Sequence, residues 1–421
     1  MLFFSCRPFS IIEGEGFKAL ATKLISIGAR YGKVDDIGQV LPCATTVSRH
    51  LGDIVTKEKA KLCRELVSVN QFGVTTDLWT HQHTNDSYVT VTVQYIKDWK
   101  LRSCILATRP MNERHTAENV RNAVKGVLKE FSALRPGNVY VSDNASNMKA
   151  AFRDNTWFGC ACHNLNLVLS HGLQANTSSD SEDGLPQEIT ELIDICKELV
   201  TLAKRTKLNS QLETTLKQCV VTRWNSILTT LKSVSSNLAD LQIICISTED
   251  KGNRRLLRLL ADIKESLLLE VISVLEPFDT ATKCLSADKA PTVHLVVPTK
   301  VQLKKSLTAA ATDNAITAQM KRHLQQQLEQ YYAVGPLHYT ATLLDPRLKD
   351  NADVLPPAQR AAAVSDLRQL VDAVPHLPIG LQEEEQEEPV PAKRIKLEDS
   401  FYGNLFSATA TPASGPNEVH M

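Results

Sequence analysis

The spacing of hydrophobic residues along the chain changes from a helical to a strand period. Residues 17–70 are predicted to be mostly helical, because Phe17, Leu20, Leu24 and Ile27 lie on one helix face. The next three segments, FGVTTDLWT, DSYVTVTVQYI and WKLRSCILATRPM, alternate with a period of two and are rich in β-branched residues. Short links join them, which most simply predicts an antiparallel meander of three strands.

Helices and strands alternate after the meander. HTAENVRNAVKGVLKEFSAL is predicted to be a helix with Thr116 as its N-cap, and residues 138–142 form a short buried strand that ends at Asp143. A helix (ASNMKAAFRD) and a strand-to-helix passage (FGCACHNLNLVLSHGL) follow. This order predicts an α/β fold with a mixed sheet and excludes a doubly wound parallel sheet.

The remaining sequence predicts a helical region and a tail. Apolar stripes at helical spacing continue to about residue 333 and are interpreted as core packing. The tail contains a run of glutamates and is rich in Pro, Ser and Thr, which predicts disorder. We therefore expect a helical N-terminal region (1–70), an α/β core (71–175), an acidic loop (176–187), a helical insertion with remaining core (188–350) and a disordered C-terminal tail (351–421).

Composition limits the possible functions. The chain of 421 residues has 47 basic and 47 acidic side chains, so overall positive charge cannot drive binding to nucleic acid, and any DNA contact needs a local patch. No stretch approaches the roughly 20 apolar residues of a membrane span, and the first residues do not resemble a signal peptide. We expect an intracellular, soluble protein without membrane contact. Ten cysteines include no C-x-x-C pair, so no zinc finger is expected.

Two aspartates are candidates for metal chemistry. Asp77 lies inside the first predicted strand, where a charge is unusual, and Asp143 ends the fourth. Both could point into one cleft, where paired carboxylates would hold Mg²⁺. The alternative for Asp143 is the N-cap of the following helix. The cluster of Cys160, Cys162 and His163 could bind a metal, but a buried strand end is the simpler interpretation.

Several segments together resemble one protein family. TTDLWT, HTAENV, VSDNASNM, the C-x-x-H pair Cys160 and His163, TRWNS and LLDPRLKD resemble the hAT superfamily of DNA transposases, and most of all its domesticated relatives, the BED-finger family. The resemblance runs from about residue 8 to 350 in the proper order. It implies an RNase H-like core interrupted by a helical insertion.

The resemblance also implies roles for individual residues. Asp77 and Asp143 match the first two of three acids that hold Mg²⁺ for attack on a phosphodiester. Arg223 and Trp224 match the family pair whose tryptophan stacks on an extruded base of bound DNA, although Trp224 also fits a helical core stripe. Cys160 and His163 match a pair with an architectural role.

Departures from the family pattern shape the functional prediction. The BED finger is not found, and no S-E-R-x-F-S-like segment supplies the third acid or the dimerisation region. We therefore expect weak Mg²⁺ binding at most and no dimerisation through that region. The prediction is a nuclear, catalytically inactive regulator of transcription that binds DNA or protein. The alternatives are a Mg²⁺-dependent hAT-type transposase or nuclease, and a truncated fragment of a longer BED-finger protein.

The tail carries two short motifs. PVPAKRIKLED resembles a nuclear import signal, with an import carrier as the expected partner of Lys393, Arg394 and Lys396. Within it, residues 395–398 (IKLE) have the form of a SUMO-acceptor site at Lys396, which makes the SUMO machinery a second expected partner. The alternative interpretation is a solvated run of charges.

Overall fold

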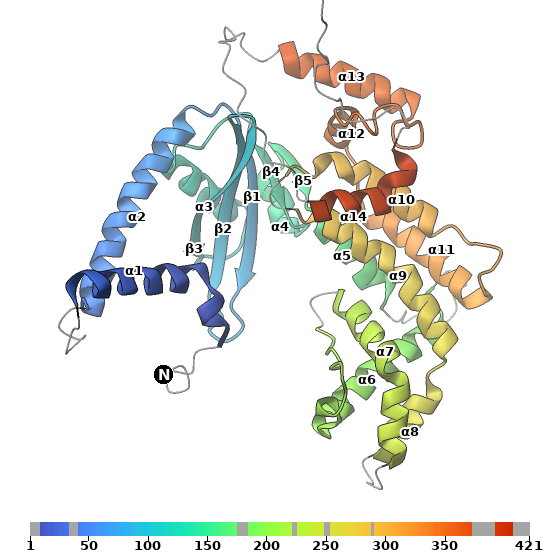
Figure 1. Cartoon of the computed structure of the whole chain (residues 1–421). Coiled ribbons are helices and arrows are strands. Elements are labelled where there is room, and N and C mark those ends of the chain that lie inside the picture. The colour runs from blue at the N-terminus through green and yellow to red at the C-terminus, as the bar shows by residue number, and fades with distance from the viewer. Residues whose placement is uncertain are drawn as a thin grey trace, which may run out of the picture. The chain divides into compact units, whose positions relative to one another are not determined.

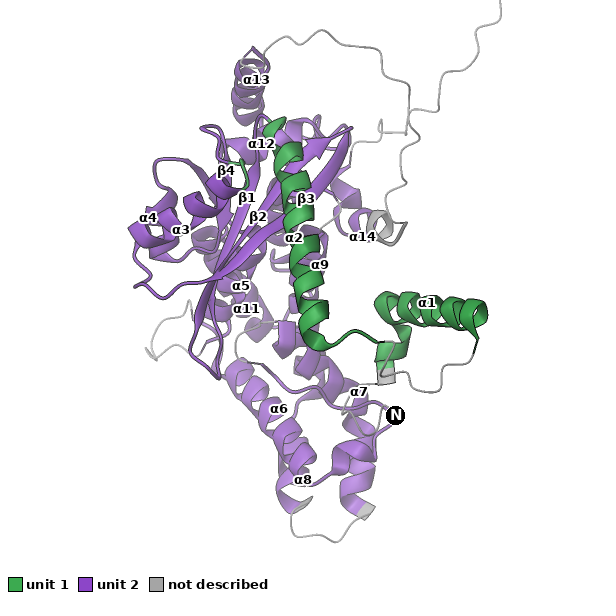
Figure 2. Ribbon diagram, turned by 90° about the vertical axis from the view of Figure 1, so that its left-hand side faces the viewer, with its two compact units in different colours: residues 1–69, 131–133 green, residues 70–130, 134–421 purple. Residues whose placement is uncertain are grey.

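The computed structural model describes residues 9–32, 41–174, 184–220, 225–247, 253–287, 290–372 and 392–406. Figure 2 shows two compact units, one of residues 1–69 with 131–133 and one of residues 70–130 with 134–421. The first unit contains η1 (Phe9–Glu13), α1 (Glu15–Tyr31) and α2 (Ala44–Val67). α1 buries none of its residues, and α2 buries only Leu66.

The second unit contains a five-stranded sheet in the order β3-β2-β1-β4-β5. The meander of β1 (Gly73–Thr80), β2 (Ser87–Lys97) and β3 (Lys100–Pro110) is antiparallel, whereas β4 (Val139–Ser142) and β5 (Thr156–Gly159) join it in parallel (Figure 1). The predicted mixed α/β sheet is confirmed.

One face of this sheet forms a core with two helices. Val89, Val91 and Val93 of β2 are at most 1% exposed, because alternate side chains of a strand point to the same face. α3 (Ala117–Glu130) contacts β2 and β3, and α4 (Ser146–Phe152) contacts α3 and β5. The ring of Phe152 stacks on Tyr140 of β4, with centroids 4.6 Å apart.

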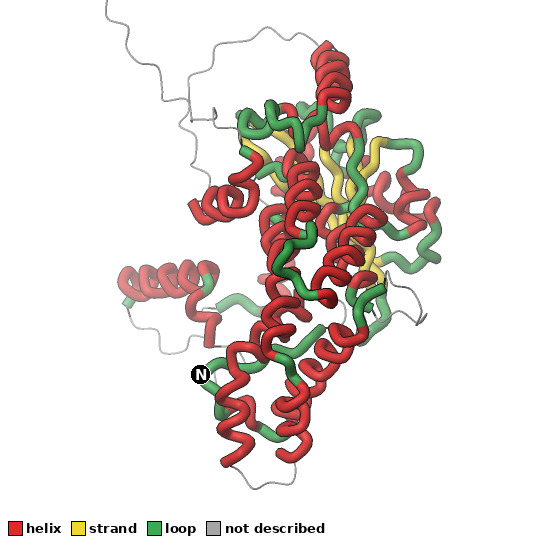
Figure 3. Tube along the Cα trace, turned by 90° about the vertical axis from the view of Figure 1, so that its right-hand side faces the viewer, coloured by secondary structure: helices red, strands yellow, loops and turns green. Residues whose placement is uncertain are grey.

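The rest of the second unit is mainly helical (Figure 3). α5 (Ala161–Gly172) contacts α11, and a Cβ at Gly172 would lie 2.6 Å from a methyl group of Leu324 in that helix, so a larger residue there would force the leucine side chain to shift. Many of the helices share one hydrophobic cluster. Their bounds are α6 (Gln187–Arg205), η3 (Leu208–Ser210), α7 (Asn225–Ser247), α8 (Asn253–Asp262), α9 (Glu265–Leu285), η4 (Val293–Leu295), α10 (Val296–Ser306), α11 (Ala315–Tyr331) and α12 (Pro336–Leu343).

The prediction of a disordered tail is wrong for the described part of residues 351–421. α13 (Pro357–Asp372), α14 (Ala392–Tyr402) and η5 (Gly403–Leu405) are helical. Tyr402 and Leu405 are fully buried, and Phe401 is 8% exposed. Burial of these apolar side chains explains the order, because the hydrophobic effect outweighs the high local charge. Most of the predicted acidic loop lies outside the described residues, and its last residue, Gln187, begins α6.

None of the described helices is both long and apolar enough to cross a lipid bilayer.

Candidate functional site at the carboxyl ends of the parallel strands

Parallel pairing brings Asp77 and Asp143 next to each other. β1 and β4 pair with Thr75 opposite Val141. Asp77 and Asp143 each follow these partners by two residues. We infer that the same register, extended one residue past the end of β4, aligns them at the carboxyl ends of the strands. Because side chains alternate along a strand, both carboxylates point to the same face of the sheet. Asp77 is exposed and Asp143 is half-buried, so solvent reaches the pair.

The loop after β4 fixes the backbone around Asp143. The Oδ1 atom of Asp143 accepts a hydrogen bond from the backbone N–H of Ala145 at 3.2 Å, and Ala145 itself is the N-cap of α4. The interpretation of Asp143 as the helix N-cap is therefore wrong, because its carboxylate closes a turn that precedes α4 and lies two residues before the N-cap. Asn144 donates a hydrogen bond to Asn164, and a side chain at Gly159 would collide with Asn144.

The pair has the chemistry of a partial magnesium site. Carboxylate oxygens are the ligands that Mg²⁺ prefers, and the metal keeps several waters when it has only one or two carboxylates. Within the described ranges, no group of three or more His, Cys, Asp or Glu side chains could hold a metal ion. Glu398, a glutamate of the tail, is paired elsewhere, because its carboxylate lies 3.3 Å from the guanidinium of Arg347. Asp77 and Asp143 could therefore hold one Mg²⁺ with water completing its coordination.

Cys160 lies beside Asp143 at the end of β5. Ser142 pairs with Gly159, so the next residues of the two strands are Asp143 and Cys160, and the Cys160 N–H donates to the Ser142 carbonyl at 2.8 Å. A hydrogen bond from Cys162 lowers the pKa of the Cys160 thiol to about 6, against the opposing effect of burial. The backbone at His163 and Cys162 adds to the lowering.

The predicted C-x-x-H pair therefore lies where β5 passes into α5. Cys160 is the N-cap residue of α5, and His163 is half-buried in its first turn. The neighbouring Cys162 thiol lies 3.3 Å from the Ser286 hydroxyl, next to the C-terminal end of α9. These contacts connect the strand end with the helical part of the unit, which is compatible with an architectural role.

Arg223 and Trp224 lie outside the described residues. The residues on either side are held together by hydrogen bonds. The Ser226 hydroxyl donates to the Val220 carbonyl and accepts from the Val220 N–H, both at 2.8 Å. Asn225 at the start of α7 donates to Asp279 of α9 at 3.3 Å. The stacking role implied for Trp224 stays a prediction.

An aromatic pair that we did not predict lies beside Asp77. Trp79 and Tyr88 pair across β1 and β2, and their rings stack with centroids 4.8 Å apart and an interplanar angle of 22°. Trp79 is 40% exposed and lies on the same sheet face as Asp77, two residues away. The alternation in TTDLWT could have revealed this arrangement from the sequence. Exposed aromatic rings of this kind provide stacking surfaces for nucleobases.

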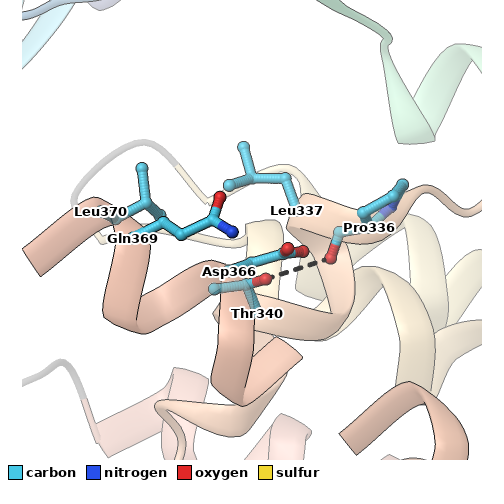
Figure 4. A pocket seen from close by; sticks show the side chains of 6 residues that line it. All are labelled: Pro336, Leu337, Thr340, Asp366, Gln369 and Leu370. Carbon is cyan, nitrogen blue, oxygen red and sulfur yellow. Dashed lines mark hydrogen bonds between the residues drawn. The ribbon is translucent and has the colours of Figure 1, made fainter. Parts of the chain in front are cut away.

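A shallow pocket lies elsewhere, between α12 and α13 (Figure 4). Thr340 in its wall donates a hydrogen bond to the Pro336 carbonyl at 3.3 Å, and Asp366 is the one charged lining residue. None of the predicted site residues lines this pocket. The carboxyl ends of the parallel strands are therefore the stronger candidate site.

Comparisons with known proteins agree with this architecture. Residues 75–155 match the model described as the ZBED1 RNase-like domain, and residues 2–46 match the Hermes transposase DNA-binding domain. The acid pair thus lies in an RNase-like domain of a transposase-related protein. The second match falls in residues 1–70, for which the sequence predicts helices but no DNA-binding role.

Three relatives illustrate the relationship. The chain is 29% identical to the transposable element Hobo transposase of Drosophila melanogaster over 78% of its own length and 49% of that protein. It is 27% identical to zinc finger protein 618 of Mus musculus, over 98% of the chain and 41% of that protein. It is 23% identical to the putative transcriptional regulator tpeD of Talaromyces stipitatus, over 81% of the chain and 42% of that protein. The chain therefore spans less than half the length of these relatives. Together, the two domain matches and these relatives support a hAT-derived, ZBED-like protein, as the resemblance predicted.

Proposed function

We propose that this chain is a nuclear, transposase-derived regulator of transcription that binds DNA without cleaving it. The observation that carries the proposal is the match of residues 2–46 to a transposase DNA-binding domain. The relationship to a zinc finger protein and to a putative transcriptional regulator supports regulation as its role. The sheet of the second unit would then be an RNase H-like core that no longer performs strand cleavage.

The charge of the N-terminal unit supports DNA binding. Residues 1–69 have ten basic and seven acidic side chains, a net charge of +3 in a chain whose total is zero. Lys18, Lys23 and Arg30 of α1 are all exposed. A local excess of positive charge attracts the phosphate backbone, which dominates the affinity of DNA-binding proteins. The neutrality of the whole chain therefore does not oppose DNA binding by this unit.

The strand-end site supports binding better than cleavage. Two-metal hydrolysis of a phosphodiester needs ligands for two ions about 4 Å apart. Asp77 and Asp143 provide two carboxylates, and the described ranges add no third acidic, histidine or cysteine ligand. Trp79 next to this pair could stack on a base of bound DNA.

The experiment is an electrophoretic mobility-shift titration of the whole chain with duplex DNA at several salt concentrations. Replacing Lys23 and Arg30 by alanine should weaken binding and reduce the slope of log K against log salt by about 0.9 for each lost phosphate contact. The matched control replaces Arg153 and Lys264, two exposed cations of the second unit, by alanine. Equal affinities of the two double variants would contradict DNA binding through α1.

A Mg²⁺-dependent transposase or nuclease is the second candidate. The observation in its favour is the register that aligns Asp77 with Asp143. The test is nicking of supercoiled DNA with and without Mg²⁺. Nicking that needs Mg²⁺ and disappears in both Asp77→Asn and Asp143→Asn would establish the enzyme and exclude the inactive regulator.

A further inference from the structure

Helix α14 contains both motifs that the sequence placed in the tail. The segment Ala392–Tyr402 includes the basic residues of the import signal and the four residues of the SUMO-acceptor motif. α14 contacts α9 and α10 (Figure 1). The motif is therefore part of a docked helix, in contrast to the disordered tail that its sequence predicts.

Aromatic and aliphatic side chains anchor the C-terminal end of α14. The Tyr402 hydroxyl lies 2.7 Å from the hydroxyl of Thr299 in α10, and both residues are fully buried. Leu405 is also fully buried, and the Asn351 amide donates to its carbonyl at 2.7 Å. Tyr402 and Leu405 belong to the large hydrophobic cluster of the unit, so releasing α14 would expose core surface to water.

The acceptor motif itself takes part in this docking. Leu397 packs against the hydrophobic cluster, and the side chain of Glu398 is 7% exposed. The Glu398 carboxylate accepts a hydrogen bond from Arg347 at 3.3 Å, and the same guanidinium binds the buried Asp345 at 2.8 Å. The Arg347 guanidinium also lies 4.5 Å from the ring centre of Phe406. Contacts within the motif and on its C-terminal side thus fix it to the body of the unit.

We propose that docking of α14 withholds the Lys396 acceptor motif from the SUMO-conjugating enzyme, so that modification requires release of the helix. An enzyme that binds a short peptide motif needs an accessible backbone and free motif side chains. In the docked helix, the Leu397 and Glu398 side chains are in contact with the unit. The rate of modification should therefore follow the population of the released state. This proposal rests on the acceptor hypothesis for Lys396 and is independent of DNA binding.

The test is a reconstituted reaction with purified SUMO, its activating enzyme and its conjugating enzyme, without a ligase. The substrates are the whole chain and a synthetic peptide of residues 390–400. We expect the peptide to be modified and the whole chain to react at least about tenfold more slowly. Tyr402→Ala, which removes the main anchor, should raise the rate of the whole chain to nearly that of the peptide. Adding Lys396→Arg to Tyr402→Ala should abolish the increase.

Two further variants distinguish release of α14 from general unfolding. Tyr402→Phe keeps the ring and removes the hydroxyl that contacts Thr299, so it should raise the rate by roughly fivefold while circular dichroism remains that of the wild type. Ser400→Ala changes an exposed position of the same helix and should have no effect. An unmodified peptide, a wild-type chain that reacts as fast as the peptide, or a Tyr402→Phe rate equal to that of the wild type would each overturn the proposal.

Discussion

Replacing Arg347 by methionine should strongly destabilise the second unit. Arg347 lies between two carboxylates, those of Asp345 and Glu398, whose side chains are 6% and 7% exposed. Removing one partner of a buried ion pair costs about 3–5 kcal/mol, because the remaining charge is left without compensation. Asp345 keeps a hydrogen bond from the residue 347 backbone N–H, and methionine preserves apolar contact with Phe406. We therefore expect the lower end of this range, about 3 kcal/mol.

Denaturant and thermal unfolding measure this loss, and Arg360→Met provides the matched control. Arg360 pairs with Asp350 at a similar distance, 2.9 Å, but the two side chains are 47% and 46% exposed. An exposed pair of this kind contributes about 0–1 kcal/mol. For a unit of this size, the melting temperature should fall by roughly 4 °C in Arg347→Met and by at most about 1 °C in the control. Equal losses in the two variants would refute the argument that the buried network stabilises the unit.

The pH dependence provides an independent check of the same cause. Burial alone would raise the pKa of Asp345, but the hydrogen bonds from Arg347 outweigh it and lower the pKa below its usual value. In the wild type this stability is present above the unfolded pKa of about 3.9 and is lost as the pH falls through the lower folded value. Without the guanidinium, burial should raise the pKa. The variant should therefore gain stability as the pH falls from neutral towards the unfolded value of about 3.9, whereas the wild type gains none from this group over that range.

Three other predictions test the remaining hypotheses. Asp77→Asn and Asp143→Asn should leave DNA affinity unchanged or raise it in mobility-shift titrations, because each removes negative charge; a loss of binding would contradict this. Burial lowers the pKa of His338, so the unit should lose stability as the pH falls below about 6.5, and His338→Gln should reduce that loss in thermal melts; an unchanged pH profile would exclude His338 as its origin. Alanine replacement of Lys393, Arg394 and Lys396 should release a tagged chain into the cytoplasm, as seen by fluorescence microscopy. Unchanged nuclear location of this variant would refute the import signal.

The sheet could be predicted from the sequence because its signals are local. Val89, Val91 and Val93 alternate with polar residues, and short links leave an antiparallel meander as the simplest arrangement. The parallel direction of β4 and β5 also follows, because each is reached through a helix that returns the chain to the end of the sheet at which the preceding strand began. These features depend on neighbouring residues, so one sequence was sufficient.

The docking of α14 could not be predicted in the same way, because its partners are distant in the chain. Tyr402 contacts Thr299, 103 residues earlier, and Glu398 contacts Arg347, 51 residues earlier. Composition around Glu398 shows glutamates, lysines and prolines, which are typical of disorder. The anchoring residues form a short apolar group after the charged run, and their burial depends on a surface built by other helices. The composition of this segment therefore indicates its charge, whereas the distant residues that pair with these charges leave no trace in it.

The same distinction explains why the candidate site could be predicted only in part. Asp77 and Asp143 belong to adjacent parallel strands, so their alignment follows from strand register and the position of each acid within its strand. Trp79 follows from the same alternation. A further metal ligand on a helix would instead depend on long-range packing, which leaves no local pattern. Glu398 illustrates the difficulty, since a glutamate in the tail is a possible ligand by sequence, whereas its contact with Arg347 commits it to the docking of α14. Assigning catalysis from the acid pair alone would therefore give more weight to local register than the chemistry of a two-metal site permits.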